Sequence, residues 1–116
     1  MKLINLGFYD ENKVKYKELL SQHANKLNSA EKLYLTHYLK KGVPYLVVPG
    51  LLVDLLDENK KICSQEICTD GVFAWSKDIL FYLEKHNTFI EFELLKHAER
   101  NKWEIPPNID LSKLKI

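Results

Sequence analysis

Five acidic side chains are the residues of this sequence best suited to charge-based chemistry; they are Asp54, Asp57, Glu58, Glu66 and Asp70. Paired carboxylates can act as a general acid and a general base. The first three acids, however, are followed by two lysines, Lys60 and Lys61, a composition more typical of a solvated loop than of a catalytic pair. With five acids against two lysines, residues 54–70 have a net charge of −3. We therefore predict either a solvated loop or an acidic patch that steers a basic partner protein.

The cysteines and histidines do not match the pattern of a metal site or a nucleophilic site. Cys63 and Cys68 are five residues apart, which fits no zinc-ligand spacing. The histidines fall on separate predicted helices, and a Cys68–His86 pair has no accompanying oxyanion signal. We expect structural thiols, with a redox switch as the alternative. Glycine-rich phosphate loops and nucleophile elbows are missing too, so we predict no enzyme, cofactor, metal ion or small-molecule ligand.

Composition indicates a single domain that covers residues 1–116. Of the 116 residues, 46% are hydrophobic and 28% are charged, which is enough to bury a core without metals or disulfides. No apolar run is long enough to span a bilayer. The first residues do not resemble a secretory signal. We therefore expect a cytoplasmic protein.

Charge is distributed unevenly along the chain, although the net charge is only +1. Residues 1–42 carry eight lysines against four acids, a local net charge of +4. One interpretation is a nucleic-acid-associated regulator that uses these lysines. However, Arg100 is the only arginine, and arginine makes most of the specific contacts to bases. Nucleic acid is therefore the less favoured partner.

The spacing of apolar residues predicts two helices in the first 42 residues. Asp10 is the expected N-cap of the first helix. Asn28 is the expected N-cap of the second, with Glu31 three residues later completing a capping box. Gly42 is expected to end this helix in a left-handed conformation.

Extended structure is predicted in the middle of the chain. Residues 43–50 are rich in β-branched and aromatic side chains, but two prolines confine them to an edge strand or an irregular run. Residues 51–56 are mainly apolar, and their periodicity does not distinguish a helical turn from a strand. The Asp70-Gly71 pair predicts a two-residue turn in a hairpin within residues 62–75.

The two-residue turn sets the register of the predicted hairpin, so that residue 69 pairs with residue 72 and residue 66 with residue 75. Strand alternation then divides the side chains between two faces. The bulkier face, which we expect to be packed, holds Glu66, Cys68, Phe73 and Trp75. The other face holds Ile67, Thr69, Val72 and Ala74.

Two further helices are predicted after the hairpin. Ser76 is the expected N-cap of the third helix, and Thr88 with Glu91 is the expected capping box of the fourth. The tail, residues 108–116, either docks loosely or frays. Together these elements predict an α+β fold that is mostly α-helical, with about four helices and a small antiparallel hairpin near residues 62–75.

A longer pattern in the second half of the chain resembles a group of small bacterial proteins. Thr69-Asp70-Gly71 is followed by the aromatic residues Phe73 and Trp75, then by a helix that contains Tyr82 and a second helix that ends near Trp103. Over residues 40–105 this pattern is similar to that of immunity proteins of bacterial polymorphic-toxin and contact-dependent growth inhibition systems.

The resemblance implies a non-catalytic role. An immunity protein binds one cognate toxin and blocks its active site or its entry into a working complex. If the toxin is a nuclease, its basic cleft would face the acidic residues between 54 and 70; alternatively, the lysine-rich helices face an acidic toxin surface. A small adaptor domain without a toxin partner is the remaining alternative.

Overall fold

The computed structural model describes residues 2–57 and 60–116. In these residues the order of elements is β1 (Ile4–Leu6), η1 (Tyr9–Asn12), α1 (Lys13–Gln22), α2 (Ser29–Lys40), β2 (Val43–Asp54), β3 (Lys60–Thr69), β4 (Phe73–Ser76), α3 (Asp78–His86), α4 (Phe92–Arg100) and η2 (Leu111–Lys113), where η marks a short 3-10 helix. The predicted α+β class and the four predicted helices are confirmed. The predicted mostly α-helical character is only partly matched, because a four-stranded sheet makes up much of the described chain.

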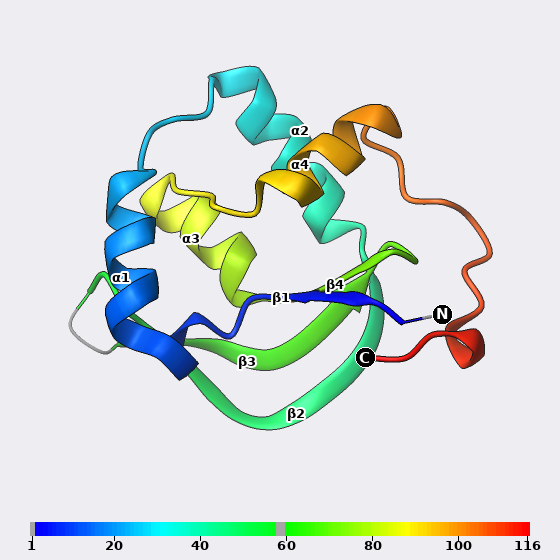
Figure 1. The fold of residues 1–116 in the computed structure, drawn as a ribbon, viewed down its shortest axis with the longest axis horizontal. Coiled ribbons are helices and arrows are strands. Elements are labelled where there is room, and N and C mark those ends of the chain that lie inside the picture. The colour runs from blue at the N-terminus through cyan, green and yellow to red at the C-terminus, as the bar shows by residue number, and fades with distance from the viewer. Residues whose placement is uncertain (1, 58–59) are drawn as a thin grey trace.

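The strands form one mixed sheet with the order β1-β4-β3-β2. The pairs β2–β3 and β3–β4 are antiparallel, whereas β1 lies parallel to β4. Figure 1 shows α2, α3 and α4 on one side of the curved sheet, α1 at one end of it, and the C-terminal tail returning to β1. The predicted small hairpin is therefore only the β3–β4 part of a larger sheet. In the described part of the chain, no helix has the length and apolar character needed to cross a bilayer.

Two apolar clusters lie on opposite faces of the sheet. The larger one packs between sheet and helices and contains Cys68, Phe73 and Trp75 together with buried side chains of all four helices. The smaller one contains Ile67 and Ala74 and is partly covered by the C-terminal tail. The predicted division of the hairpin into two faces is thus correct for these five residues.

The predicted register of the hairpin is wrong by two residues. Thr69 pairs with Ala74 and Cys68 with Trp75, because the connection is longer than a two-residue turn. Gly71 has φ +97 within this connection, a conformation that an L-residue rarely adopts. A shift by two residues keeps every side chain on its face, since alternation has a period of two. This explains why the predicted faces hold for these five residues although the predicted pairs do not. Val72, predicted on the face of Ile67 and Ala74, instead packs against the larger cluster.

The capping box of α2 is confirmed. Asn28 Oδ1 accepts the backbone N–H of Glu31 at 2.7 Å, and Glu31 Oε1 accepts the backbone N–H of Asn28 at 3.2 Å. The other predicted starts are wrong. Asp10 lies inside η1, and α1 begins after Asn12, whose side chain makes no capping bond. Ser76 lies in β4, and α3 begins after Lys77.

Thr88 has a different role from the predicted cap. Its hydroxyl donates to the backbone oxygen of Leu20 at 2.6 Å and is buried there. α4 begins later, after Glu91, which makes no side-chain capping bond. Thr88 therefore holds the end of α1 against the connection between α3 and α4, a contact between residues far apart in the sequence.

The extended segment is longer than predicted, and the tail is docked. β2 continues through Asp54, so most of residues 51–56, which the periodicity left open, is strand and the rest is a turn. At the other end of the sheet, the Leu3 N–H donates to the Lys115 backbone oxygen at 2.7 Å. The Tyr45 hydroxyl donates to the Leu114 backbone oxygen at 2.8 Å.

Gly42 is required for packing and not for a left-handed helix end. Its φ lies outside the left-handed region, unlike that of Gly71. A Cβ atom at this position would lie 2.4 Å from Cζ2 of Trp75, which is only 1% exposed. The ring cannot move away easily, because it is enclosed by the core.

We expect Gly42→Ala to lower the free energy of unfolding by about 1–3 kcal/mol through overpacking against the indole. Urea denaturation followed by circular dichroism measures this change. In a Trp75→Phe background the outer part of the indole is missing, so the same substitution should cost clearly less. An equal cost in both backgrounds would contradict the proposed contact.

Candidate functional site

Asp54 is buried and connects the end of β2 to α3. Its side chain is 1% exposed, with Oδ2 at 2.8 Å from Nε2 of His86 and Oδ1 accepting the N–H of Leu56 at 2.9 Å. Beside it, the Tyr82 hydroxyl accepts the N–H of Leu55 at 2.9 Å and donates to the Val53 backbone oxygen at 3.1 Å. These bonds use the carboxylate for structure, so it is not available to a partner.

Asp70 is buried in the same way at the β3–β4 connection. Oδ1 accepts the backbone N–H groups of Val72 at 2.9 Å and Phe73 at 2.8 Å. Oδ2 accepts the hydroxyl of Tyr38 from α2 and lies 3.4 Å from Nε2 of His97 on α4. Burial and the bond to Asp70 raise the pKa of the Tyr38 hydroxyl above its usual value, so it remains a donor.

The remaining predicted acids are separate from these two. Oε2 of Glu66 lies 3.1 Å from Nζ of Lys77 and accepts the hydroxyl of Ser64 at 2.5 Å; the bond from Ser64 and then the lysine lower the pKa of Glu66. Asp57 pairs with Lys60 at 3.5 Å. Glu58 lies outside the described residues.

The prediction that these acids form one exposed acidic patch is therefore wrong for Asp54 and Asp70. Asp54 and Asp70 are each 1% exposed as whole residues, and Asp57 and Glu66 form ion pairs with lysines. The described acids do not combine into one exposed negative surface. Asp54 follows the buried Leu52 by two positions on the same strand, so strand alternation places both side chains on the same face. Partner binding by Asp57 and Glu66 stays a prediction.

A third buried acidic cluster was not predicted from the sequence. The Tyr9 backbone N–H donates to Oδ2 of Asp78 at 3.0 Å, and its hydroxyl donates to Oε1 of Glu91 at 2.7 Å. Burial raises the pKa of Asp78 to about 6, although the N–H of Tyr9 opposes this shift. Burial also raises the pKa of Glu91. The cluster joins η1 to α3 and to the start of α4, and a pairing over such a sequence distance leaves no local signal.

The thiols have the properties of structural cysteines. Both are free, with Cys68 buried and Cys63 partly buried. Burial raises the pKa of Cys63 to about 11, with Asp78 adding to the effect, and burial also raises the pKa of Cys68. Little reactive thiolate is present near neutral pH under these conditions. Within the part of the chain that the structure describes, no group of three or more potential metal ligands occurs.

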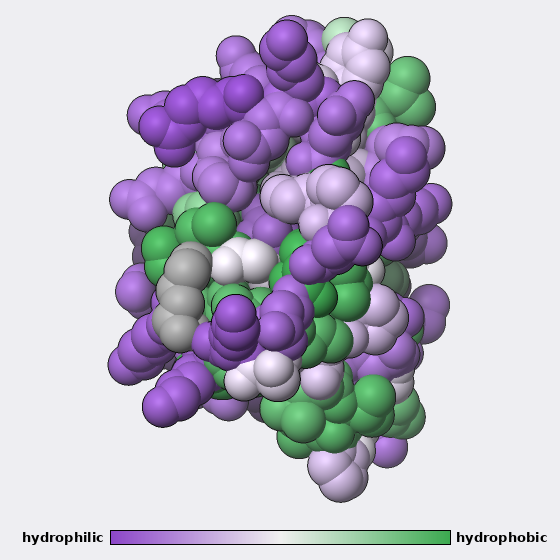
Figure 2. All heavy atoms as spheres, turned by 90° about the vertical axis from the view of Figure 1, so that its right-hand side faces the viewer, coloured by the Kyte–Doolittle hydropathy of each residue, from purple (hydrophilic) through white to green (hydrophobic). Residues whose placement is uncertain are grey.

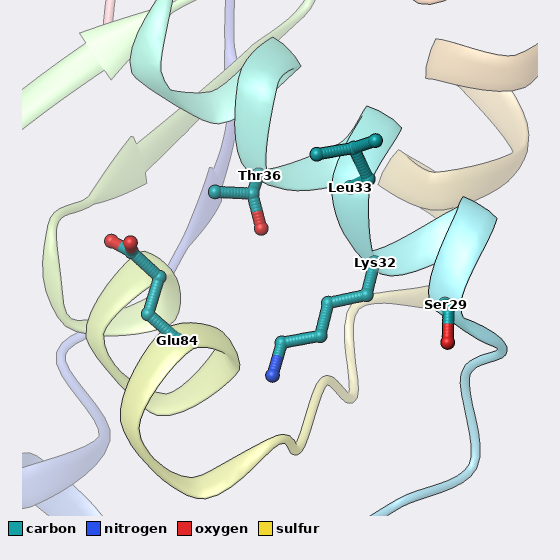
Figure 3. Close-up of a pocket in the computed structure, with 5 residues that line it drawn as sticks. All are labelled: Ser29, Lys32, Leu33, Thr36 and Glu84. Carbon is teal, nitrogen blue, oxygen red and sulfur yellow. The ribbon is translucent and has the colours of Figure 1, made fainter.

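A groove lies between α2 and α3. Its volume is about 350 Å³, and its lining residues are Ser29, Lys32, Leu33, Thr36 and Glu84. Figure 3 shows the Lys32 side chain extending into the space between the helices, with the Thr36 hydroxyl facing the same space. Glu84 on the opposite wall is paired with Lys40 at 3.2 Å. Among the described residues Lys32 forms no ion pair, so its charge is available to a partner.

Apolar side chains are exposed at the groove and on β2. Leu33 is 69% exposed, and its neighbour Tyr34 is 50% exposed and stacks on Trp103 with ring centroids 5.6 Å apart. On β2, Val47 is the most exposed apolar residue. Figure 2 shows hydrophobic side chains gathered at the lower end of the molecule, the level at which β2 lies in Figure 1.

Comparison of the chain with protein-family models, with curated proteins and with solved structures gave no significant match. The similarity to immunity proteins therefore stays a prediction from the sequence pattern. In the structure, two residues of that pattern, Asp70 and Trp75, are buried. These two side chains stabilise the fold, so a partner-binding site is expected among the exposed residues.

We expect Asp70→Ala to lower the free energy of unfolding by about 3–5 kcal/mol, because Tyr38 and two backbone N–H groups lose their acceptor in the interior. Asp57→Ala removes only an exposed ion pair and should cost about 0–1 kcal/mol. Urea denaturation of both variants tests this difference. Similar stabilities would show that Asp70 is not a structural carboxylate.

We expect the stability of the protein to fall as the pH rises from about 4 to about 7 because of Asp78. Its raised pKa means that the folded state holds the proton more tightly than the unfolded state. Its contribution is therefore full below the unfolded-state pKa and is lost as the pH rises through about 6. A shift of about two pH units corresponds to roughly 3 kcal/mol.

The variant Asp78→Asn has no ionisable group at this position but can still accept the N–H of Tyr9. Its free energy of unfolding should exceed that of the wild type at pH 7 and approach it at pH 4, as measured by urea denaturation over this range. A difference in the free energy of unfolding between variant and wild type that does not change with pH would contradict the raised pKa of Asp78.

Proposed function

We propose that the protein is an immunity protein of the cytoplasm, which neutralises a cognate bacterial toxin by stoichiometric binding and has no catalytic role. The sequence pattern from Thr69 to Trp103 supports this proposal. The resemblance places the function in partner recognition, and the structure adds a surface suited to that task.

The observation that carries the proposal is the groove between α2 and α3. It combines an exposed leucine, Leu33, with a lysine, Lys32, whose charge no described residue neutralises. An apolar anchor such as Leu33, with a charge pair beside it, supplies affinity and specificity in a protein complex when a partner covers it.

The charge around the groove favours an acidic toxin surface. α2 carries Lys32 and Lys40 against Glu31, a net charge of +1. Lys40 pairs with Glu84 across the groove, which leaves the charge of Lys32 for a partner. Two of the five acids considered for a basic toxin are buried. The sequence left two geometries open. The one in which the lysine-rich helices face an acidic toxin surface is therefore the better supported. Electrostatic attraction would then increase the rate of association.

Co-expression tests the proposed function directly. The candidate toxin is the effector domain encoded immediately upstream of this protein. We expect this domain to arrest growth alone, to be harmless when the protein is co-expressed, and to co-purify with it at equal stoichiometry. If the neighbouring domain is harmless, or if the two do not co-purify, the proposal fails. Salt-dependent binding of duplex DNA or RNA instead would favour the regulator.

For the groove itself, we expect Leu33→Asp to weaken toxin binding by about 10–100-fold, because a charge replaces the apolar anchor. Lys32→Glu should slow association and reverse its dependence on salt. Surface plasmon resonance at several salt concentrations measures both effects.

Matched controls come from α1. Val14→Asp and Lys17→Glu make the same chemical changes at exposed positions away from the groove. They should bind the toxin nearly as the wild type does, and all four variants should keep the wild-type melting temperature. Equal losses in groove variants and controls would move the interface away from the groove.

A further inference from the structure

β2 is a long edge strand. It ends the sheet order and pairs, among the described residues, only with β3. Its 12 residues correspond to about 40 Å of extended chain, comparable to the longest dimension of the molecule, 39 Å. The backbone groups on its outer side therefore form a template for another strand along much of the protein.

The outer strand carries no charged residue from Val43 to Val53. Soluble proteins usually protect an edge strand with charges, prolines or bulges, because an unprotected apolar edge recruits further strands. β2 has two prolines and three register shifts but no charge in this range. Here the exposed apolar side chains are Leu46 at 46%, Val47 at 68% and Leu51 at 53%. Such a surface is expected to be covered by a partner in the functional state.

Two prolines and three irregularities limit how a partner can pair with β2. Pro44 and Pro49 have no N–H to donate, and the register against β3 shifts beside both of them. Between the two prolines, the uninterrupted run of donors is residues 45–48, which includes the exposed Leu46 and Val47. A partner would therefore combine a short main-chain ladder with contacts between apolar side chains.

We propose that β2 is the interface of a homodimer, in which two copies pair antiparallel along this edge about a two-fold axis. A two-fold axis brings the same patch of both copies together. Because residues 43–53 are uncharged, this superposition opposes no like charges, and Leu46 and Val47 of each copy face apolar residues of the other. The low net charge of +1 gives little repulsion between the copies.

The dimer does not depend on the proposed immunity function. In Figure 1, α2 and β2 lie on opposite sides of the molecule, with the sheet and the core between them. A dimer formed through β2 would leave the groove of each copy open. Failure of one proposal therefore leaves the other intact.

Sedimentation equilibrium of the purified full chain tests the dimer. We expect twice the chain mass at about 100 μM protein and dissociation at micromolar concentrations. Val47→Lys and Leu51→Lys place like charges at the interface and should give monomers at all these concentrations. Val14→Lys, at a helix position that is 84% exposed, should remain dimeric. Circular dichroism should show the same fold for all variants.

Hydrogen exchange of the wild type provides a measurement without substitutions. The amides of residues 45–48 that face away from β3 should become protected as the concentration rises. Three results would overturn the proposal: a wild-type monomer at about 100 μM, dimers that persist in both β2 variants, or equal dissociation of Val14→Lys. A wild-type monomer that acquires this protection only with another protein would show that β2 accepts a foreign strand instead.

Discussion

The fold depends on the burial of the Asp70 carboxylate. In the interior an isolated carboxylate is strongly destabilising, so it is tolerated only where donors surround it. Asp70 obtains two backbone N–H groups from its own turn, the hydroxyl of Tyr38 from α2, and the neighbouring ring of His97 from α4. The turn of the hairpin, the second helix and the last helix must therefore come together around one group. This requirement couples the sheet to the helices that cover it.

Other buried acids repeat this arrangement elsewhere. Asp54 joins the end of β2 to α3 through His86, and Asp78 joins α3 to η1 through the N–H of Tyr9. Two of the five acids that first suggested chemistry or charge steering, Asp54 and Asp70, thus connect elements of the fold. The two surfaces proposed for partners are the groove between α2 and α3, which carries a lysine, and the uncharged edge of β2. They differ in chemistry, and this difference favours an acidic protein at the first and a second copy at the second.

Combining the two surfaces gives a specific picture of the protein. A dimer formed through β2 would present two grooves facing away from each other, so that each copy can hold one partner. Lys32 and Leu33 lie on α2, whose start is fixed by the capping box of Asn28 and Glu31 and whose inner face is packed through Leu35 and Tyr38. A rigid helix holds Lys32 and Leu33 in place before the partner arrives, which reduces the entropy lost on binding.

The sequence alone determined the features that depend on near neighbours. The capping box at Asn28 follows from two residues three positions apart, and the two faces of the hairpin follow from alternation, which an error of two residues does not change. Tertiary structure alone decided which polar groups are buried and which groups they form hydrogen bonds with. β1 pairs with β4, about 70 positions later in the chain, and Thr88 bonds to Leu20 instead of capping a helix. Asp54 and Asp70 carry the same charge whether exposed or buried, and only the packing of distant helices against them settles which it is.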